Sequence, residues 1–330
     1  MSAFDLAFNN LLSPMVLFFA LGLASALARS DLSVPEAIAK FLALYLMMAI
    51  GFKGGVAVAK NGVDLRLLAV MLAGIVLSAL IPLIGFTLLR LTTRLSRIDA
   101  AAVAAHYGSI SIVTFVAATQ TLTSLGIPYE GYLVAVAAVM ETPAILTALF
   151  LARGAGNASV AAHGGEQGTG ALIREIGLNG SVVMLIGSFA IGWITGERGM
   201  AAVEPFVGQL FFGMICLFLL DMGLIAGRGM REGLKALSWQ AVAFGLYMPL
   251  ISAGLAVLAC LMLGLSVGGA ALMITLAASA SYIAVPAAMR LAMPEAKPSI
   301  YLTLSLGVTF PFNLALGIPF YVWLATLIKG

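Results

Sequence analysis

The chain has 330 residues, of which 62% are hydrophobic and only 9% are charged. This composition excludes an ordinary soluble domain, because such domains carry about 25% charged residues. The formal net charge is +3, and no basic patch is interleaved with aromatic residues, so a nucleic-acid-binding protein is also excluded. The two cysteines, Cys216 and Cys260, lie in apolar stretches without metal-ligand spacing. We therefore expect no cofactor and no metal other than a coupling sodium ion.

Long apolar windows recur along the whole chain, and each is long enough to cross a membrane. A helix needs about 20 apolar residues to span about 30 Å of hydrocarbon. Such windows lie near 10–28, 35–52, 66–90, 99–125, 129–152, 173–195, 204–226, 236–264, 268–293 and 299–328. We therefore predict an all-α integral membrane protein with ten transmembrane helices in a lipid bilayer.

The chain repeats itself once. A Ser-x-Ser motif followed seventeen residues later by Pro occurs at 109–128 and again at 279–298. We predict a first repeat in 1–153, a flexible cytoplasmic linker in 154–172 and a second repeat in 173–330. Each repeat has five predicted spans, and an odd number makes the second repeat enter the membrane the opposite way up. This 5+5 inverted repeat is typical of secondary transporters, which bind substrate near the midplane between the two copies.

Positive charges are unequally divided between the two sides of the predicted bundle. The odd-numbered loops and their borders carry Arg29, Arg90, Arg94, Arg97, Arg153, Arg174, Arg228, Arg231, Lys235, Arg290 and Lys297, whereas the even-numbered loops and the termini carry Lys53, Lys60, Arg66, Arg198 and Lys329. The positive-inside rule places the richer side in the cytoplasm. Both termini are then periplasmic or extracellular, and we expect a bacterial inner membrane location.

Two predicted spans contain residues that interrupt a helix. The fourth has Gly108 among hydroxyl residues, and the ninth has Pro286 shortly after its Ser-x-Ser motif. A helix that restarts at membrane depth offers unpaired amide groups and the positive end of its dipole to an anion. Such hydroxyls can instead bond to their own helix, and that alternative stays open. The candidate substrate-binding residues are Ser109, Ser111, Thr114, Ser279 and Ser281.

Polar residues elsewhere in the spans are candidates for binding or coupling a cation, because a charge at membrane depth is costly and usually functional. Glu141 precedes Thr142-Pro143, and the matching part of the last span carries Thr and Asn. Carboxylate, hydroxyl and amide oxygens suit a hard cation such as sodium. The predicted cation-binding residues are Glu141, Thr309, Asn313 and Asp221. For Asp221 and Lys53 we weigh an ion pair between the repeats against separate exposure at the two surfaces, and for His106 a proton relay against packing.

Several motifs resemble those of the cyanobacterial sodium-dependent bicarbonate symporter family, in the same order along nearly the whole chain. They are Val34-Pro-Glu-Ala-Ile-Ala, Gly-x-x-Gly-Gly from Gly51 to Gly55, Ser111 with Thr114, Glu141-Thr-Pro143-Ala, Ala277-Ala-Ser279-x-Ser281 and Pro294-x-x-x-Pro298-Ser-x-Tyr301. The resemblance implies ten spans as two inverted repeats, core and gate subdomains, a homotrimer, and inhibition by a PII-like protein. It also implies that the serines and threonine bind bicarbonate and sodium. This chain departs from the family at Glu141 and Tyr282, each of which stands where the family has an aspartate.

We therefore predict a secondary active transporter that couples sodium to the symport of a small anion, with bicarbonate as the first choice, by alternating access. One alternative is a sodium- or proton-coupled symporter of another small monocarboxylate, and another is an anion channel. We do not expect an enzyme, because the sequence has neither an H-E-x-x-H zinc motif nor a G-x-S-x-G nucleophile elbow.

Overall fold

The computed structural model describes residues 8, 11–62, 65–153, 180–233, 237–283, 285–286, 288–289 and 293–328. Throughout these residues the regular structure is helical, without strands. The helices are α2 (Pro14–Leu27), α3 (Glu36–Asn61), α4 (Leu65–Thr92), α5 (Arg97–Gly108), α6 (Ile112–Ser124), α7 (Leu133–Val139), α8 (Glu141–Arg153), α11 (Gly180–Glu204), η2 (Pro205–Gln209), α12 (Phe211–Gly233), α13 (Trp239–Leu263) and α14 (Val267–Ala278). A last helix combines α16 (Pro298–Leu302), η4 (Thr303–Thr309), α17 (Phe310–Phe312), η5 (Asn313–Gly317) and α18 (Ile318–Leu327).

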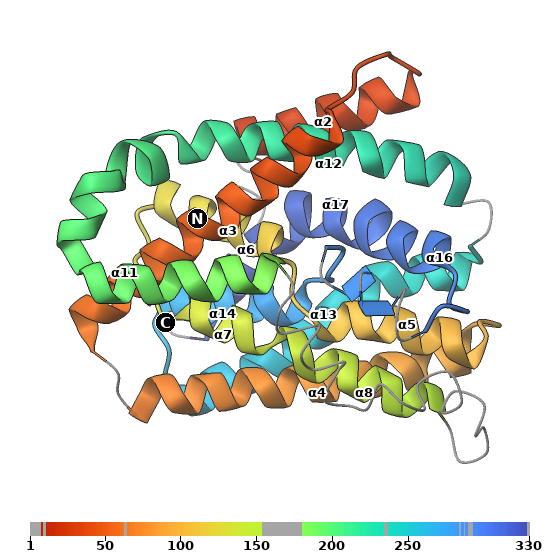
Figure 1. Cartoon of the computed structure of the whole chain (residues 1–330). Coiled ribbons are helices and arrows are strands. Elements are labelled where there is room, and N and C mark those ends of the chain that lie inside the picture. The colour runs from red at the N-terminus through yellow and green to blue at the C-terminus, as the bar shows by residue number, and fades with distance from the viewer. Residues whose placement is uncertain are drawn as a thin grey trace, which may run out of the picture.

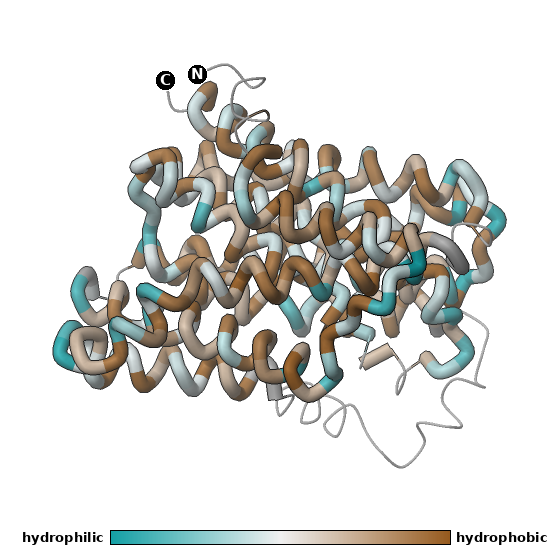
Figure 2. The backbone as a smooth tube through the Cα atoms, turned by 90° about the horizontal axis from the view of Figure 1, so that it is seen from above, coloured by the Kyte–Doolittle hydropathy of each residue, from teal (hydrophilic) through white to brown (hydrophobic). Residues whose placement is uncertain are grey.

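The helices form a bundle whose composition suits a membrane. Within the described residues, seven helical segments are long and apolar enough to cross a bilayer, and α2 and α14 are shorter apolar helices. Figure 2 shows hydrophobic residues along the helices and hydrophilic residues gathered toward the two ends of the bundle. The protein is therefore a multi-pass, all-helical membrane protein, whereas the count of ten spans stays a prediction. The predicted linker, 154–172, lies outside the described residues.

Four helices form one group through two close helix pairs. Figure 1 shows α12 running along α2, and α11 packs in the same way along α3. Glycine makes both approaches possible, because a Cβ atom at Gly55 would overlap the Phe189 carbonyl, and one at Gly223 would overlap the Phe19 carbonyl. Small residues have this role in membrane proteins, where lipid provides no hydrophobic force that drives helices together.

Two of the remaining helices are enclosed over nearly their whole length. From Ala100 to Gly108 in α5, and from Gly268 to Ala278 in α14, every residue is buried. Helix α5 packs against α4 and α8, and α14 against α13 and α18. The α5–α8 pair is antiparallel: the Arg97 side chain donates to the Leu151 carbonyl at 2.8 Å, and Gly108 lies against Ala144.

A carboxylate anchors the N-terminal end of each enclosed helix. Asp99 accepts hydrogen bonds from the Ser96 hydroxyl at 2.8 Å and from the Lys297 amide at 2.9 Å, which ties α5 to the start of the last helix. Glu130 accepts from the amide and hydroxyl of Ser266, at 3.0 and 2.7 Å, which ties α14 to the segment before α7. Both serines are N-caps that accept an amide of their own helix. We call these groups the Asp99 clasp and the Glu130 clasp.

Candidate functional site

The chain leaves the helical conformation between α5 and α6. Ser109 and Ser111 have extended backbones, with φ/ψ of −90°/157° and −103°/108°. The Ser111 hydroxyl then caps α6, because it accepts the Thr114 amide at 3.2 Å and the Thr114 hydroxyl at 2.9 Å. The next amides, of Ile112 and Val113, have no acceptor within their own helix. The first turn of α6 is therefore a positive helix end enclosed in the protein.

The second motif forms a matching interruption after α14. Helix α14 ends at Ala278, and Ser279 is extended, with φ/ψ of −87°/167°. The described residues that follow directly, 279–283, are not helical. The Ser281 hydroxyl accepts the Val285 amide at 3.5 Å, a long hydrogen bond.

The two interruptions contact each other directly. The Ser111 amide donates to the Ser279 hydroxyl at 2.8 Å, and that hydroxyl donates to the Leu276 carbonyl at 2.8 Å. In the other direction, the Ser281 amide donates to the His106 carbonyl at 2.7 Å. The structure thus brings four of the five candidate anion-binding residues to one place: Ser111, Thr114, Ser279 and Ser281. We call this place the crossing.

Two polar groups at the C-terminal end of α5, beside the crossing, lack partners. The Ser109 hydroxyl, in a residue that is 1% exposed, has no hydrogen bond to the described part of the chain. The same is true of the His106 Nε2 atom, although the ring Nδ1 lies 2.7 Å from the Ala102 carbonyl. A buried polar group without a partner is unfavourable by about 1–3 kcal/mol. A ligand that supplied the missing hydrogen bonds would therefore stabilise this end of α5.

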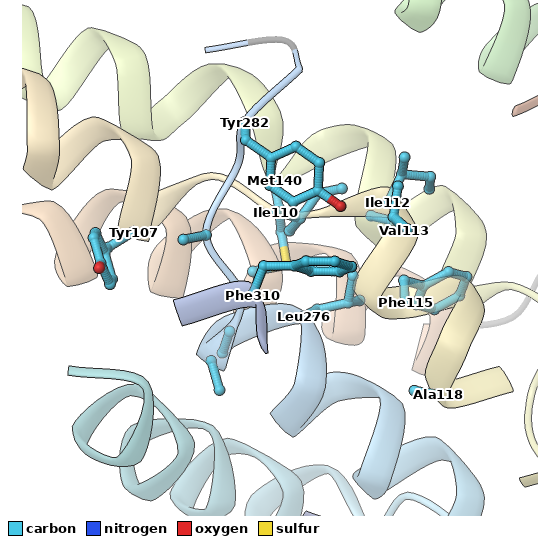
Figure 3. Close-up of a cluster of buried hydrophobic side chains, with 14 of the residues drawn as sticks. Tyr107, Ile110, Ile112, Val113, Phe115, Ala118, Met140, Leu276, Tyr282 and Phe310 are labelled. Atoms are coloured by element: carbon cyan, nitrogen blue, oxygen red, sulfur yellow. The ribbon is translucent and has the colours of Figure 1, made fainter. Parts of the chain in front are cut away.

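Apolar and aromatic side chains enclose the crossing. Figure 3 shows the Tyr282 ring near Ile110 and Met140, with its hydroxyl turned toward the first turn of α6. That hydroxyl lies beside Ser111 without a hydrogen bond of ordinary geometry. The Tyr282 and Phe310 rings meet edge to face, with centroids 5.2 Å apart. An apolar surrounding of this kind strengthens polar interactions with any ion held there.

Glu141 lies level with the first interruption. It is 7% exposed and begins α8, which runs antiparallel to α5, so the start of α8 faces the end of α5. Ser78 of α4 fixes this point: its hydroxyl donates to the Met140 carbonyl and accepts the Ala144 amide at 3.2 Å. Sequence reasoning missed Ser78. The available signal was a serine in the middle of an otherwise apolar window.

Thr309 and Asn313 make hydrogen bonds with protein groups. Thr309 donates to the Gly245 carbonyl at 2.7 Å, and its hydroxyl lies 2.6 Å from that of Tyr107. Asn313 donates to the Ala278 carbonyl, the last of α14, at 2.8 Å and accepts from the Tyr321 hydroxyl at 2.7 Å. No hydrogen bond joins either residue to Glu141. Their role in cation binding stays a prediction.

Asp221 and Lys53 do not form the ion pair that the repeat suggested as one possibility. Asp221 is buried in α12, 4% exposed, and its Oδ2 has no hydrogen-bond partner among the described residues. The Lys53 ammonium lies over the Phe211 ring, 4.1 Å from its centroid, in a cation–π contact. The partner of the Lys53 ammonium is thus the face of the Phe211 ring and not the Asp221 carboxylate.

A comparison with known protein families gives a match. The family model of the Na+-dependent bicarbonate transporter superfamily matches residues 14–326, nearly the whole chain. This confirms the resemblance found in the sequence motifs. No curated protein matches the chain.

Proposed function

Because the chain belongs to the Na+-dependent bicarbonate transporter superfamily, we propose that it is a sodium-coupled bicarbonate symporter that works by alternating access. Its family is a family of transporters, not of enzymes. In this proposal the chain has ten spans in a 5+5 inverted repeat. The fourth span is α5 with α6, and the ninth begins with α14; both are broken.

The crossing is the observation that carries the proposal. Interrupted helices at membrane depth are tolerated where protein or a water-filled cavity satisfies the freed backbone groups. Here the amides of Ser111 and Ser281 are each satisfied by the other repeat. A site of this kind changes shape whenever the repeats move relative to each other, as a carrier requires.

Pairs of equivalent contacts support the inverted repeat. Gly55 of α3 meets a carbonyl of α11, and Gly223 of α12 meets a carbonyl of α2. The two clasps form a second such pair, because each joins the N-cap of an enclosed helix to a segment of the other repeat. With equivalent contacts, the two halves of the chain can exchange arrangements. In one arrangement the site is open to one side of the membrane, and in the other it is open to the opposite side.

We assign the anion to the crossing and the cation to its border. The first amides of α6 and the hydroxyls of the crossing would hold the bicarbonate oxygens; the residues are Ser109, Ser111, Thr114, Ser279 and Ser281. A carboxylate level with the interruption, Glu141, would help to hold sodium. Thr309, Asn313 and Asp221 complete the proposed cation-binding set. Bound sodium then stabilises the arrangement of helices that also binds the anion. The transport of sodium is thereby coupled to the transport of bicarbonate.

Further parts of the proposal rest on the family resemblance and on the charge pattern. They are a homotrimer, a PII-like regulatory partner, a bacterial inner membrane location, and termini on the outer side. Cross-linking in native membranes would test the oligomer, and labelling of single introduced cysteines near each end would test the orientation.

Uptake of labelled bicarbonate into proteoliposomes tests the function, with an inward sodium gradient compared with an equal potassium gradient. We expect accumulation only with sodium. Ser279→Ala should raise the half-saturating bicarbonate concentration, because the Ser111 amide loses its acceptor. Thr275→Ala is the matched control, since that hydroxyl bonds the Ala271 carbonyl of its own helix at 2.7 Å.

Each contrary result points to a defined alternative. Uptake that is indifferent to sodium would contradict the coupling proposal. Sodium-driven uptake of acetate in place of bicarbonate would indicate a monocarboxylate symporter. Passive anion flux without accumulation would indicate a channel.

A further inference from the structure

The hydrogen bond of the His106 ring fixes which nitrogen carries the proton. Nδ1 lies 2.7 Å from the Ala102 carbonyl. A carbonyl oxygen can only accept, so Nδ1 is the donor and carries the hydrogen. In a neutral imidazole the other nitrogen, Nε2, is then an acceptor with a free lone pair.

The ring is neutral in this setting. His106 is 0% exposed, and its ring stacks on Tyr301 with centroids 4.5 Å apart and an interplanar angle of 26°. A buried imidazolium needs a carboxylate to offset the loss of its hydration, and the ring's hydrogen bond goes to a carbonyl instead. Nε2 is consequently an acceptor enclosed in the protein without a donor among the described residues.

This acceptor belongs to the last turn of α5, next to the crossing, because His106 lies three residues before Ser109 and positions three apart share one face of a helix. The main-chain carbonyl of His106 accepts the Ser281 amide, and the chain interruption begins at Ser109, whose hydroxyl also has no partner. The first amides of α6 can only donate, whereas the Ser109 and Tyr282 hydroxyls can donate or accept. A ligand that satisfies both Nε2 and these amides must donate one hydrogen bond and accept at least one other.

We infer that His106 Nε2 accepts the O–H hydrogen of the transported anion and thereby selects oxyanions that carry a single proton. Hydrogencarbonate has one O–H group and two further oxygens that accept. Formate, acetate and nitrate have no O–H group, so they leave Nε2 without a partner. A site that is built to bond a substrate hydroxyl discriminates against analogues that lack it, because its own buried group stays unpaired. This inference rests on the proposed function and adds to it the basis of anion selection.

Anion binding to the purified full-length protein tests the inference without transport. Thermal unfolding is followed in a mildly alkaline buffer while bicarbonate, formate or nitrate is titrated, since a ligand of the folded state raises the unfolding temperature. His106→Phe keeps an aromatic ring against Tyr301 and removes the acceptor. We expect it to raise the half-maximal bicarbonate concentration about fivefold to tenfold, the loss of one neutral hydrogen bond, and to leave formate and nitrate unchanged.

His106→Gln serves as the second variant, because its amide oxygen is again an acceptor. Partial recovery of bicarbonate preference over formate in this variant supports the inference. Equal weakening of all three anions in His106→Phe would overturn it, since this is the result for a packing residue or a cationic ring. An unchanged bicarbonate titration in His106→Phe, with stabilisation intact, overturns the inference but leaves the proposed function standing. If no anion stabilises even the unaltered protein, both fail.

Discussion

The two interruptions share a backbone plan but differ in the side chains that support it. In the first repeat Ser78 of α4 reaches across to the Met140 carbonyl and the Ala144 amide at the start of α8. In the second repeat, α13 corresponds to α4 and the last helix corresponds to α8. There the hydroxyl belongs to the last helix, because Thr309 donates to the Gly245 carbonyl of α13. The comparison teaches that, under the proposed repeat, the places where helices meet are kept in both halves, whereas the side chains at each meeting point differ. The shared backbone suits motion between two packings, and the divergent side chains suit the recognition of two different ions.

The strongest test of the shared plan is steric. Gly55→Ala and Gly223→Ala each place a methyl group against a main-chain carbonyl, which cannot move away as a flexible side chain can. Each should destabilise the protein by about 3 kcal/mol or prevent folding, because overpacking in a tight interface is costly. Gly187→Ala in α11 and Gly213→Ala in α12 are matched controls within the same two helix pairs, since a methyl group there meets nothing within 4 Å. Thermal unfolding in detergent measures all four, and a large cost at only one of the two tight positions would break the equivalence.

The clasps should show a smaller and unequal effect. Asp99 is buried, whereas Glu130 is half-buried. Asp99→Asn should therefore cost about 2 kcal/mol in unfolding free energy, within the range for hydrogen bonds to charged groups. Glu130→Gln should cost less than half of this, because solvent can replace part of its hydrogen bonding. Thermal unfolding in detergent checks both variants. A larger loss of unfolding free energy in Glu130→Gln than in Asp99→Asn would contradict the view that the more buried carboxylate stabilises more.

Glu141 and Thr309 occupy equivalent positions in the two repeats, and their substitution tests the divergent chemistry. Glu141→Gln should raise the sodium concentration for half-maximal uptake at least tenfold, or about 1.4 kcal/mol, with little change in bicarbonate affinity. Thr309→Val, which removes the hydrogen bond to Gly245, should lower stability and raise that sodium concentration by a smaller factor, because a hydroxyl carries no charge. Sodium titrations of uptake separate the two, and an unchanged sodium response in Glu141→Gln would refute its assignment.

The smallest expected effect concerns the Ser111 and Ser281 hydroxyls. Ser111→Ala removes a hydroxyl that accepts at 3.2 and 2.9 Å, and should cost about 1 kcal/mol, typical of an N-cap. Ser281→Ala removes a single acceptor at 3.5 Å and should cost only a few tenths of that. Both should also raise the half-saturating bicarbonate concentration while the protein stays folded. Normal uptake in both would discard the crossing as the anion site.

The pattern of the sequence predicts which segments meet, but it does not predict how their side chains pair. Apolar windows and the Ser-x-Ser repeat were sufficient to expect a helical membrane bundle and to place Ser111, Ser279 and Ser281 near one another. Their roles in binding stay predictions. The repeat could not show that the Ser111 amide would meet a hydroxyl, because that depends on the offset of two helices far apart in the chain.

The same limit explains what was missed. Lys53 and Asp221 correspond in the repeat, yet Lys53 lies over the Phe211 ring, since an aromatic face is a partner that needs no second charge. Ser78 was overlooked because a lone serine in an apolar span usually bonds its own helix. Only the packing of α4 against the start of α8 gives it two partners elsewhere.

The crossing contains two equivalent contacts between a serine amide and a helix carbonyl, and the Ser279 hydroxyl makes one of them longer than the other. The Ser281 amide meets the His106 carbonyl directly, whereas the equivalent Ser111 amide reaches the Leu276 carbonyl only through that hydroxyl. The contact between the Ser111 amide and the Leu276 carbonyl is thus longer, because an oxygen atom lies between them. Two identical halves would rest equally often in either orientation. With this spacer, we expect the empty carrier to have a preferred resting orientation even when no ion gradient is present.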